Sequence, residues 1–146
     1  MVNRVFIDAN VLISALVFPQ GICGKALQKA LEKGIELVTS DYVIFEVKEV
    51  LSRKFPKVPL DKLQEFLELA DITLLESPTL EEVLKYEDKI SDRKDAPILA
   101  ICIMHNITLV SGDKVFQTEK VNQLISVLSC SELLKQFENN NSYRNL

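Results

Sequence analysis

Glycine and histidine are both scarce in this sequence, which holds four glycines and one histidine among its 146 residues. Phosphate-binding loops and dinucleotide-binding fingerprints each need several glycines within one short stretch, and the chain has too few to supply them. A nucleophile elbow of the kind that carries a catalytic serine is also absent. These common nucleotide-binding and hydrolase motifs are therefore excluded as the source of a function.

Metal-binding patterns built from histidine and cysteine are missing as well. His105, the one histidine, falls near the end of an apolar stretch with helical spacing, where a packed or capping histidine is the simplest interpretation. The three cysteines, Cys23, Cys102 and Cys130, lack the paired spacing of a zinc site. Because they are odd in number and far apart, we expect reduced thiols that pack as small apolar side chains.

The chain has neither a long apolar run nor an excess of positive charge. No apolar stretch approaches the roughly 18 residues of a membrane span, and the opening MVNRVFIDAN is too briefly apolar for a secretory signal. We therefore expect a cytoplasmic protein with no membrane partner. The net charge of −4 argues against a protein that holds nucleic acid through a bulk positive field. It does not exclude a nuclease, because acidic clusters that bind metal ions lower the net charge.

Apolar residues recur with two different spacings that alternate along the chain. Short apolar runs are typical of strands, and longer stretches with helical spacing separate them. The predicted strands are 4–8, 35–40, 72–77, 107–113 and 124–129, and the clearest predicted helices are 23–34, 41–55, 60–70 and 95–106. Alternation of this kind predicts an α/β fold in which a central parallel β-sheet is flanked by helices.

The length of the chain fits a single domain. A chain of 146 residues can bury roughly two-thirds of its unfolded surface around one core, and no linker or internal repeat divides it. Residues 138–146, ENNNSYRNL, are mostly polar. We therefore expect the domain to span residues 1–137 and residues 138–146 to form a polar C-terminal tail that is frayed or disordered.

Four carboxylates stand where predicted strands end or predicted helices begin. Asp8 ends the first strand, and Asp113 follows the fourth. Glu46 lies in the early turns of the helix after the second strand, and Asp95 opens the helix that leads to the fourth. Ligands of open parallel sheets bind beyond the carboxyl ends of the strands. The four side chains are therefore predicted to meet at that edge of the sheet.

Three of these carboxylates also have simple structural interpretations, which stay open. Asp95 precedes a proline as an N-cap would, and Glu46 could lie on the solvent face of an amphipathic helix. Asp113 follows a glycine and could belong to a turn. Asp8 is harder to explain in this way, because a charged group that ends a central strand loses solvation and has no evident local partner.

Carboxylates that gather at one place repel one another unless a cation neutralises them or some take up protons. Oxygen ligands without histidine or thiolate suit Mg²⁺ or Mn²⁺ rather than zinc or copper. Such ions lower the pKa of a bound water, orient it for in-line attack at phosphorus and stabilise the leaving oxygen. The pattern thus indicates hydrolysis of a phosphodiester by a metal-activated water, with one or two ions and no covalent intermediate.

Four segments together resemble the PIN domain, a nuclease family that includes the VapC-type toxins of prokaryotic toxin–antitoxin pairs. They are FIDANVLISAL, SDYVIFEVKEVL, KDAPILAICI and TLVSGDKVF, which occur in family order, and the match covers roughly residues 3–130. The resemblance implies a three-layer PIN-like fold with the first and fourth strands adjacent at the centre of the sheet. It also implies Mg²⁺- or Mn²⁺-dependent RNA cleavage, with catalytic and metal-binding carboxylates at Asp8, Glu46, Asp95 and Asp113.

The resemblance extends to four supporting positions. Asn10 and Ser14 match polar positions after the first aspartate, where a short side chain can orient a ligand or a water. Ser111 stands where the family often has threonine and keeps the hydroxyl. Asp92 lies three residues before Asp95, and either could be the better-placed ligand. Asp95 is preferred because the residues that follow it match the family pattern.

The predicted function is therefore a metal-dependent endoribonuclease that serves as the toxin of a toxin–antitoxin pair. By resemblance, its partners are an RNA substrate, a small antitoxin protein and a second copy in a symmetric homodimer. An alternative is a PIN scaffold that keeps its acidic residues but binds RNA or a protein without cutting. A phosphoacceptor receiver domain is disfavoured, because the third strand ends in Glu76 and Ser77 rather than in an aspartate.

Overall fold

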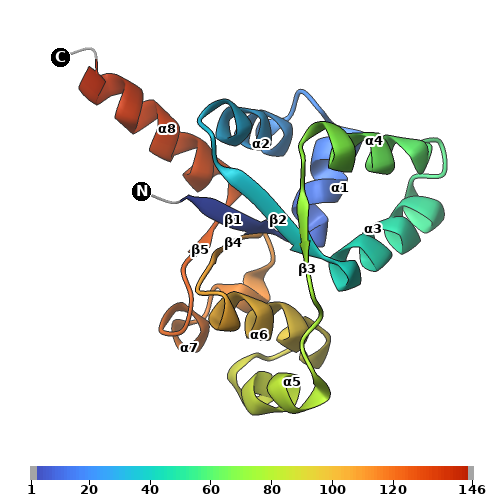
Figure 1. Ribbon diagram of the computed structural model, residues 1–146, viewed down its shortest axis with the longest axis vertical. Coiled ribbons are helices and arrows are strands. Elements are labelled where there is room, and N and C mark those ends of the chain that lie inside the picture. Colours follow the sequence, from blue (N-terminus) through green and yellow to red (C-terminus); the bar gives the residue numbers. More distant parts are fainter. Residues whose placement is uncertain (1–2, 145–146) are drawn as a thin grey trace.

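A parallel β-sheet with the first strand at its centre organises the molecule (Figure 1). The computed structural model describes residues 3–144, with side chains as far as residue 138. The strand order is β3-β2-β1-β4-β5, and each neighbouring pair is parallel. The strands are β1 (Arg4–Ile7), β2 (Glu36–Ser40), β3 (Thr73–Leu75), β4 (Thr108–Val110) and β5 (Val127–Leu128). Each overlaps one of the apolar runs in the sequence, so the predicted α/β fold is confirmed.

The strand order reverses its direction between β1 and β4. From β1 the chain adds β2 and β3 on one side, then returns to add β4 and β5 on the other. Phe6 is registered against Leu109 and Ile7 against Val110, so the predicted adjacency of the first and fourth strands is confirmed. In open parallel sheets the crevice at such a switch point is where ligands bind.

Helices cover both faces of the sheet. Right-handed crossovers place the helices that precede β2 and β3 on one face and those that precede β4 and β5 on the other. Figure 1 shows α1, α2 and α3 on one side of the sheet and α5, α6 and α7 on the other. The helices are α1 (Ala9–Val17), α2 (Ile22–Glu32), α3 (Asp41–Lys54), α4 (Asp61–Leu69), α5 (Leu80–Tyr86), α6 (Ala96–Met104), α7 (Glu119–Asn122) and α8 (Cys130–Arg144), and the 3₁₀ turns are η1 (Glu87–Lys89), η2 (Arg93–Asp95) and η3 (Lys114–Phe116).

The four helices expected from spacing appear as α2, α3, α4 and α6. Helix α2 ends just before Gly34, whose φ of 77° lies in the left-handed region that glycine adopts without strain. Helices α1, α5, α7 and α8 were not predicted. Only Asp8 separates α1 from β1, so the sequence gives α1 no turn signal of its own, and α5 has no buried residue to give it an apolar face.

The centre of the sheet is buried on both faces. Val5, Phe6 and Ile7 of β1 are fully excluded from solvent, as expected for a strand with helices above and below it. Helix α6 is apolar all round, and its residues Ile98 to Ile101 are likewise fully buried. The carboxyl end of β1 therefore lies where the buried apolar core meets the edge of the sheet.

Cys23 and Cys130 form a disulfide that joins α2 to α8, so the expectation of reduced thiols was wrong for these two residues. The sequence hides the pairing, because 107 positions separate the two cysteines and only the packing of α8 against α2 brings their Cα atoms to 5.1 Å. Cys102 is free and buried, as a packed thiol should be. Disulfides are rare in cytosolic proteins, so the cytoplasmic location stays a prediction.

Helix α8 extends into the segment that was expected to be a polar tail. Residues 138–144 belong to this helix, whereas a frayed segment was expected, and residues 145 and 146 of the predicted tail lie outside the described residues. The domain boundary at residue 137 stays a prediction. Across residues 3–144, no single helix is long and apolar enough to cross a membrane, and the one helix pair that passes by length and composition, α1 with α2, is bent by 101° at its junction.

The disulfide gives the first testable prediction. Protein that is denatured without a reducing agent should show one reactive thiol per chain, from Cys102, and three after reduction. Cys23→Ser should lower the free energy of unfolding by about 2–5 kcal/mol under oxidising conditions, because the bond closes a long loop in the unfolded chain. Thiol titration and denaturant unfolding measure these effects.

Cys102→Ser is the matched control, since this cysteine has no disulfide partner. Its stability should respond to reducing agent as the wild type does, whereas that of Cys23→Ser should not respond. Three reactive thiols before reduction would contradict the bond.

Candidate active site

Asp8 occupies the carboxyl end of the central strand and connects β1 directly to α1. Its backbone N–H donates to the carbonyl of Val110 at 3.1 Å, which continues the pairing of β1 with β4. Its Oδ1 accepts from the backbone N–H of Ala9 at 2.8 Å, so the side chain caps α1. The residue is only 5% exposed. A carboxylate is therefore held, nearly buried, at the switch point of the sheet.

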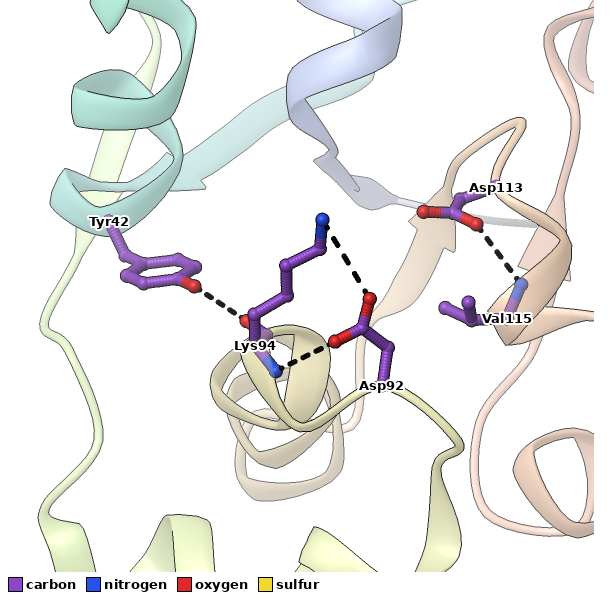
Figure 2. A network of polar contacts seen from close by, with 5 residues as sticks. All are labelled: Tyr42, Asp92, Lys94, Asp113 and Val115. Atoms are coloured by element: carbon purple, nitrogen blue, oxygen red, sulfur yellow. Dashed lines mark hydrogen bonds and ion pairs between the residues drawn. The ribbon is translucent and has the colours of Figure 1, made fainter.

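Ser111 connects Asp8 to Asp113. The Ser111 hydroxyl donates to Asp8 Oδ2 at 2.6 Å and accepts from the backbone N–H of Asp113 at 3.1 Å. Ser111 is fully buried, and a short hydrogen bond to a carboxylate is a strong one. Asp113 in turn caps η3, because its Oδ1 accepts from the Val115 N–H at 3.1 Å (Figure 2). The loop after β4 is thus fixed against the first carboxylate.

The segment after Asp8 contacts the same loop. Asn10 Oδ1 accepts from the backbone N–H of Gly112 at 3.4 Å, which joins the start of α1 to the turn that carries Asp113. This contact agrees with the supporting position predicted for Asn10. Ser14 lies one turn farther along α1 and is part-buried, and its role stays a prediction.

Glu46 reaches the site because β2 ends beside β1 and leads at once into α3. The Thr39 hydroxyl donates to the carbonyl of Ile7 at 2.8 Å, so the ends of β2 and β1 are joined just before Asp8. The Ser40 hydroxyl then accepts from the Val43 N–H and caps α3. Glu46 is part-buried in this helix, which does not support the interpretation of a fully solvated surface residue.

Asp95 stands at the N-cap position of α6 but does not act as a cap. Its side chain makes no capping hydrogen bond, and the residue is only 5% exposed. Its Oδ2 is buried and lacks a hydrogen-bond partner among the described residues. Leaving a buried charged oxygen unsatisfied costs free energy, so such groups call for an explanation. A ligand that the protein binds at this oxygen is one explanation.

The side chain of Asp92 makes local contacts with Lys94. Its Oδ1 accepts from the backbone N–H of Lys94 at 3.2 Å and caps η2, and its Oδ2 lies 3.7 Å from the Lys94 ammonium (Figure 2). Its side chain is 42% exposed, in contrast to that of Asp95. Asp95 Oδ2 has no hydrogen-bond partner among the described residues, and the choice between the two as a ligand stays a prediction.

Burial and neighbouring negative charge raise the pKa values of three of these carboxylates, Asp8, Glu46 and Asp95. Burial is the largest cause for Asp95, followed by the charges of Asp113 and Asp8, and together they raise its pKa to about 7. Burial also raises the pKa of Asp8, with Asp113 adding to the effect and the Ser111 hydrogen bond opposing it. The pKa of Glu46 is raised first by burial and then by Asp8. The predicted gathering of negative charge at one edge of the sheet is thus present.

Two residues near the carboxylates were not predicted as part of the site. The Tyr42 hydroxyl donates to the backbone carbonyl of Lys94 at 2.6 Å, and the pKa of Tyr42 is raised by burial and then by Glu46 and Asp95 (Figure 2). The Lys94 charge lowers the pKa of Glu46. Tyr42 precedes Glu46 by four residues, so helical spacing places the two on one face of α3. That spacing is the sequence signal from which Tyr42 could have been predicted as part of the site.

The residues fit a hard divalent cation by the chemistry of their donors. All four side chains offer carboxylate oxygens, which Mg²⁺ and Mn²⁺ prefer, and Asp95 Oδ2 has no other partner among the described residues. Within residues 3–144, however, no three carboxylate, imidazole or thiol groups are already placed to hold a metal ion. Binding therefore requires small movements of these side chains or bridging by the several waters that Mg²⁺ usually keeps.

Comparison with known sequences identifies one family. A sequence model of the PIN domain matches residues 4–115, a stretch that contains β1 to β4 and all four carboxylates. A search of curated proteins finds no match.

Solved structures share the fold with little sequence identity. VapBC2 from Rickettsia felis, bound to a DNA fragment from its promoter, superposes with a TM-score of 0.65 at 17% identity, covering 86% of this chain and 98% of the other. PAE2754 from Pyrobaculum aerophilum gives a TM-score of 0.64 at 19% identity, covering 95% and 99%. FitAcB from Neisseria gonorrhoeae gives 0.59 at 19% identity, covering 87% and 98%. At these identities the likeness shows the fold alone.

The raised pKa of Asp95 predicts how stability depends on pH without divalent cations. In the folded protein Asp95 keeps its proton up to about pH 7, whereas in the unfolded chain it loses it near pH 4. Between these values the folded protein binds more protons than the unfolded chain, so a rise in pH favours unfolding. The contribution of Asp95 to the free energy of unfolding should therefore fall from about pH 4 to about pH 7.

Denaturant unfolding in EDTA at pH 5 and pH 7.5 measures this effect. Asp95→Asn cannot ionise, so its stability should fall less between the two values than that of the wild type. Asp61→Asn, the same substitution at an exposed position in α4, is the control and should behave as the wild type does. Equal pH dependence in all three proteins would contradict the assignment to Asp95.

Proposed function

Because the chain belongs to the PIN domain family, we propose that it is a metal-dependent endoribonuclease that cleaves RNA by hydrolysis. The observation that carries the proposal is the group of four carboxylates at the carboxyl end of the sheet, where burial and the neighbouring charges raise the pKa values of Asp8, Glu46 and Asp95. A buried carboxylate with a free oxygen, as in Asp95, is poorly explained by a structural role alone.

In this proposal Asp8, Glu46, Asp95 and Asp113 hold one or two Mg²⁺ or Mn²⁺ ions. A bound divalent ion supplies a Lewis acid that activates water and neutralises charge on the phosphate. The Ser111 hydroxyl orients the Asp8 carboxylate by donating a hydrogen bond to its Oδ2. A carboxylate that accepts this hydrogen bond still has other lone pairs with which it can bind a cation. Asn10 holds the turn that carries Asp113 through its contact with Gly112.

Burial divides these carboxylates into two pairs with different tasks. Asp8 and Asp95 are nearly excluded from solvent, so they bind where water cannot compete. Glu46 and Asp113 are part-buried and so remain accessible from solvent. Asp95 must give up its proton before it can ligate a cation, so the apparent affinity for the ion, and with it the activity at a limiting ion concentration, should fall as the pH drops below the Asp95 pKa of about 7.

The biological role that we propose is that of a toxin controlled by a small antitoxin. VapBC2 and FitAcB, two of the similar structures, are named as assemblies of two components. We infer by analogy that this chain also binds a small protein partner and forms a homodimer, and that it acts in the cytoplasm. This part of the proposal rests on similarity of fold, which is a weaker argument than the site itself.

A second candidate function is a PIN scaffold that binds RNA or a protein without cutting. The observation that favours it is that no three ligand groups within residues 3–144 are already placed to hold a metal ion. Isothermal titration with Mn²⁺ followed by a cleavage assay distinguishes the two functions, because a scaffold would bind RNA with no turnover.

Purified protein should cleave labelled RNA in Mn²⁺ or Mg²⁺ and lose this activity in EDTA. Asp8→Asn should reduce the cleavage rate by more than about 100-fold, a larger effect than removal of an outer partner of a metal site gives. The readout is the rate of product formation on a denaturing gel. Asp61→Asn, the same substitution at an exposed position in α4, is the control and should leave the rate unchanged.

Equal cleavage by wild type and Asp8→Asn would contradict the mechanism. Binding of Mn²⁺ without any cleavage would favour the scaffold instead.

Expression of the wild-type chain in a bacterial host should arrest growth, whereas expression of Asp8→Asn should not. The arrest follows if the chain degrades cellular RNA, and its dependence on Asp8 separates this cause from the burden of expression. Growth curves after induction, with the amount of each protein matched by immunoblot, give the measurement. Normal growth with active, soluble nuclease would indicate a housekeeping enzyme in place of a toxin.

A further inference from the structure

Lys94 brings a positive charge into the group of carboxylates. Its ammonium lies 3.7 Å from Asp92 Oδ2, and its charge opposes the rise in the pKa of Glu46 that burial, Asp8 and Asp113 cause. Figure 2 shows the side chain extending from η2 toward the point where β1 passes into α1, in the space between Tyr42 and Asp113. The side chain is 68% exposed, so its charge remains accessible from solvent.

The backbone of Lys94 is fixed from two sides. The Tyr42 hydroxyl donates to its carbonyl at 2.6 Å, and its N–H donates to Asp92 Oδ1 at 3.2 Å. Tyr42 belongs to α3, the helix that carries Glu46, whereas Lys94 directly precedes Asp95. The contact therefore joins the two segments that supply these carboxylates and holds the lysine at a defined place between them.

The neighbouring cation is used differently. Arg93 is paired through Nε with Glu87 at 3.0 Å. Lys94 has only a loose ion pair with Asp92, in which both side chains are well exposed, and exposed pairs of this kind contribute little to stability. Stability thus gives little reason to hold a lysine at this position.

We propose that the Lys94 ammonium contacts a phosphate of the RNA that lies across the carboxylates. The inference rests on the proposed nuclease function and names a residue that binds its substrate. A lysine suits this task, because its ammonium is a mobile point charge with three donors that can follow a phosphate. The chain carries a net charge of −4, so the attraction for a polyanion has to come from local cations at the site.

A different role for Lys94 is that of a counter-ion that only neutralises the carboxylates. The two roles differ in what they do to RNA binding. A phosphate contact releases counterions from the RNA, so its loss reduces the dependence of affinity on salt by about 0.7 in the slope of log K against log salt for a single strand. Loss of a counter-ion inside the protein leaves that slope unchanged.

Lys94→Gln tests the proposal, and it should fold because both hydrogen bonds of this residue use its backbone atoms. Binding of a fluorescent single-stranded RNA is measured by anisotropy in Mg²⁺ at several salt concentrations, with Asp8→Asn as the background so that the RNA stays intact. Lys94→Gln should weaken binding by about 3- to 10-fold at low salt, equally for two RNAs of different sequence, and reduce the salt slope by about 0.7. Lys94→Arg should largely restore both.

Arg93→Gln is the matched control, because it removes the same charge from the adjacent residue, whose side chain is paired with Glu87. It should leave the salt slope unchanged. In the active background, Lys94→Gln should raise KM and change kcat little.

The outcomes separate this inference from the function on which it rests. If the wild type cleaves RNA but Lys94→Gln and Arg93→Gln bind it with the same slope, the role of Lys94 is wrong and the nuclease stands. If the wild type neither binds nor cleaves RNA, both proposals are wrong.

Discussion

Asp8 carries a carboxylate at the end of a strand whose apolar residues are fully buried, and the arrangement of the site follows from that placement. The charge cannot move toward solvent, because β2 and β4 pair with β1 on either side and α1 begins at the next residue. It is instead stabilised by the Ala9 N–H at the start of α1 and by the Ser111 hydroxyl from the loop after β4. Burial and this fixed charge together raise the pKa values of Glu46 and Asp95, and a cation at this edge would offset that cost.

The sequence was sufficient for the parts of the fold that depend on local patterns. The five strands, the parallel arrangement and the central position of β1 beside β4 follow from apolar runs and from the family resemblance. Asp8 could be singled out because a charge stands directly after the apolar run Val5 to Ile7, although its local role as the cap of α1 was not predicted. Helix α5 could not be predicted in the same way, since it buries no residue and so shows no apolar face.

Interactions between distant segments were beyond the reach of the sequence. The pairing of Cys23 with Cys130 depends on how α8 packs against α2, which no spacing records. In the contact between Tyr42 and Lys94, the acceptor is a backbone carbonyl. Because every residue has such a carbonyl, no pattern of side chains in the sequence indicates this contact. For Asp95 the sequence suggests a local role that the structure does not show. Its position near a proline fits an N-cap, but its side chain makes no capping hydrogen bond.

The disulfide divides the chain into a closed loop and two short arms. Glu46, Asp95 and Asp113 all lie between Cys23 and Cys130, whereas Asp8 precedes the loop. A protease that nicks a surface turn anywhere within the loop leaves both fragments covalently attached, so the nicked chain loses no part of the site. A nick between Asp8 and Cys23 instead leaves the central strand attached to the rest by non-covalent contacts alone. The short connection between α1 and α2 is therefore the place where a single cut can separate one carboxylate from the other three.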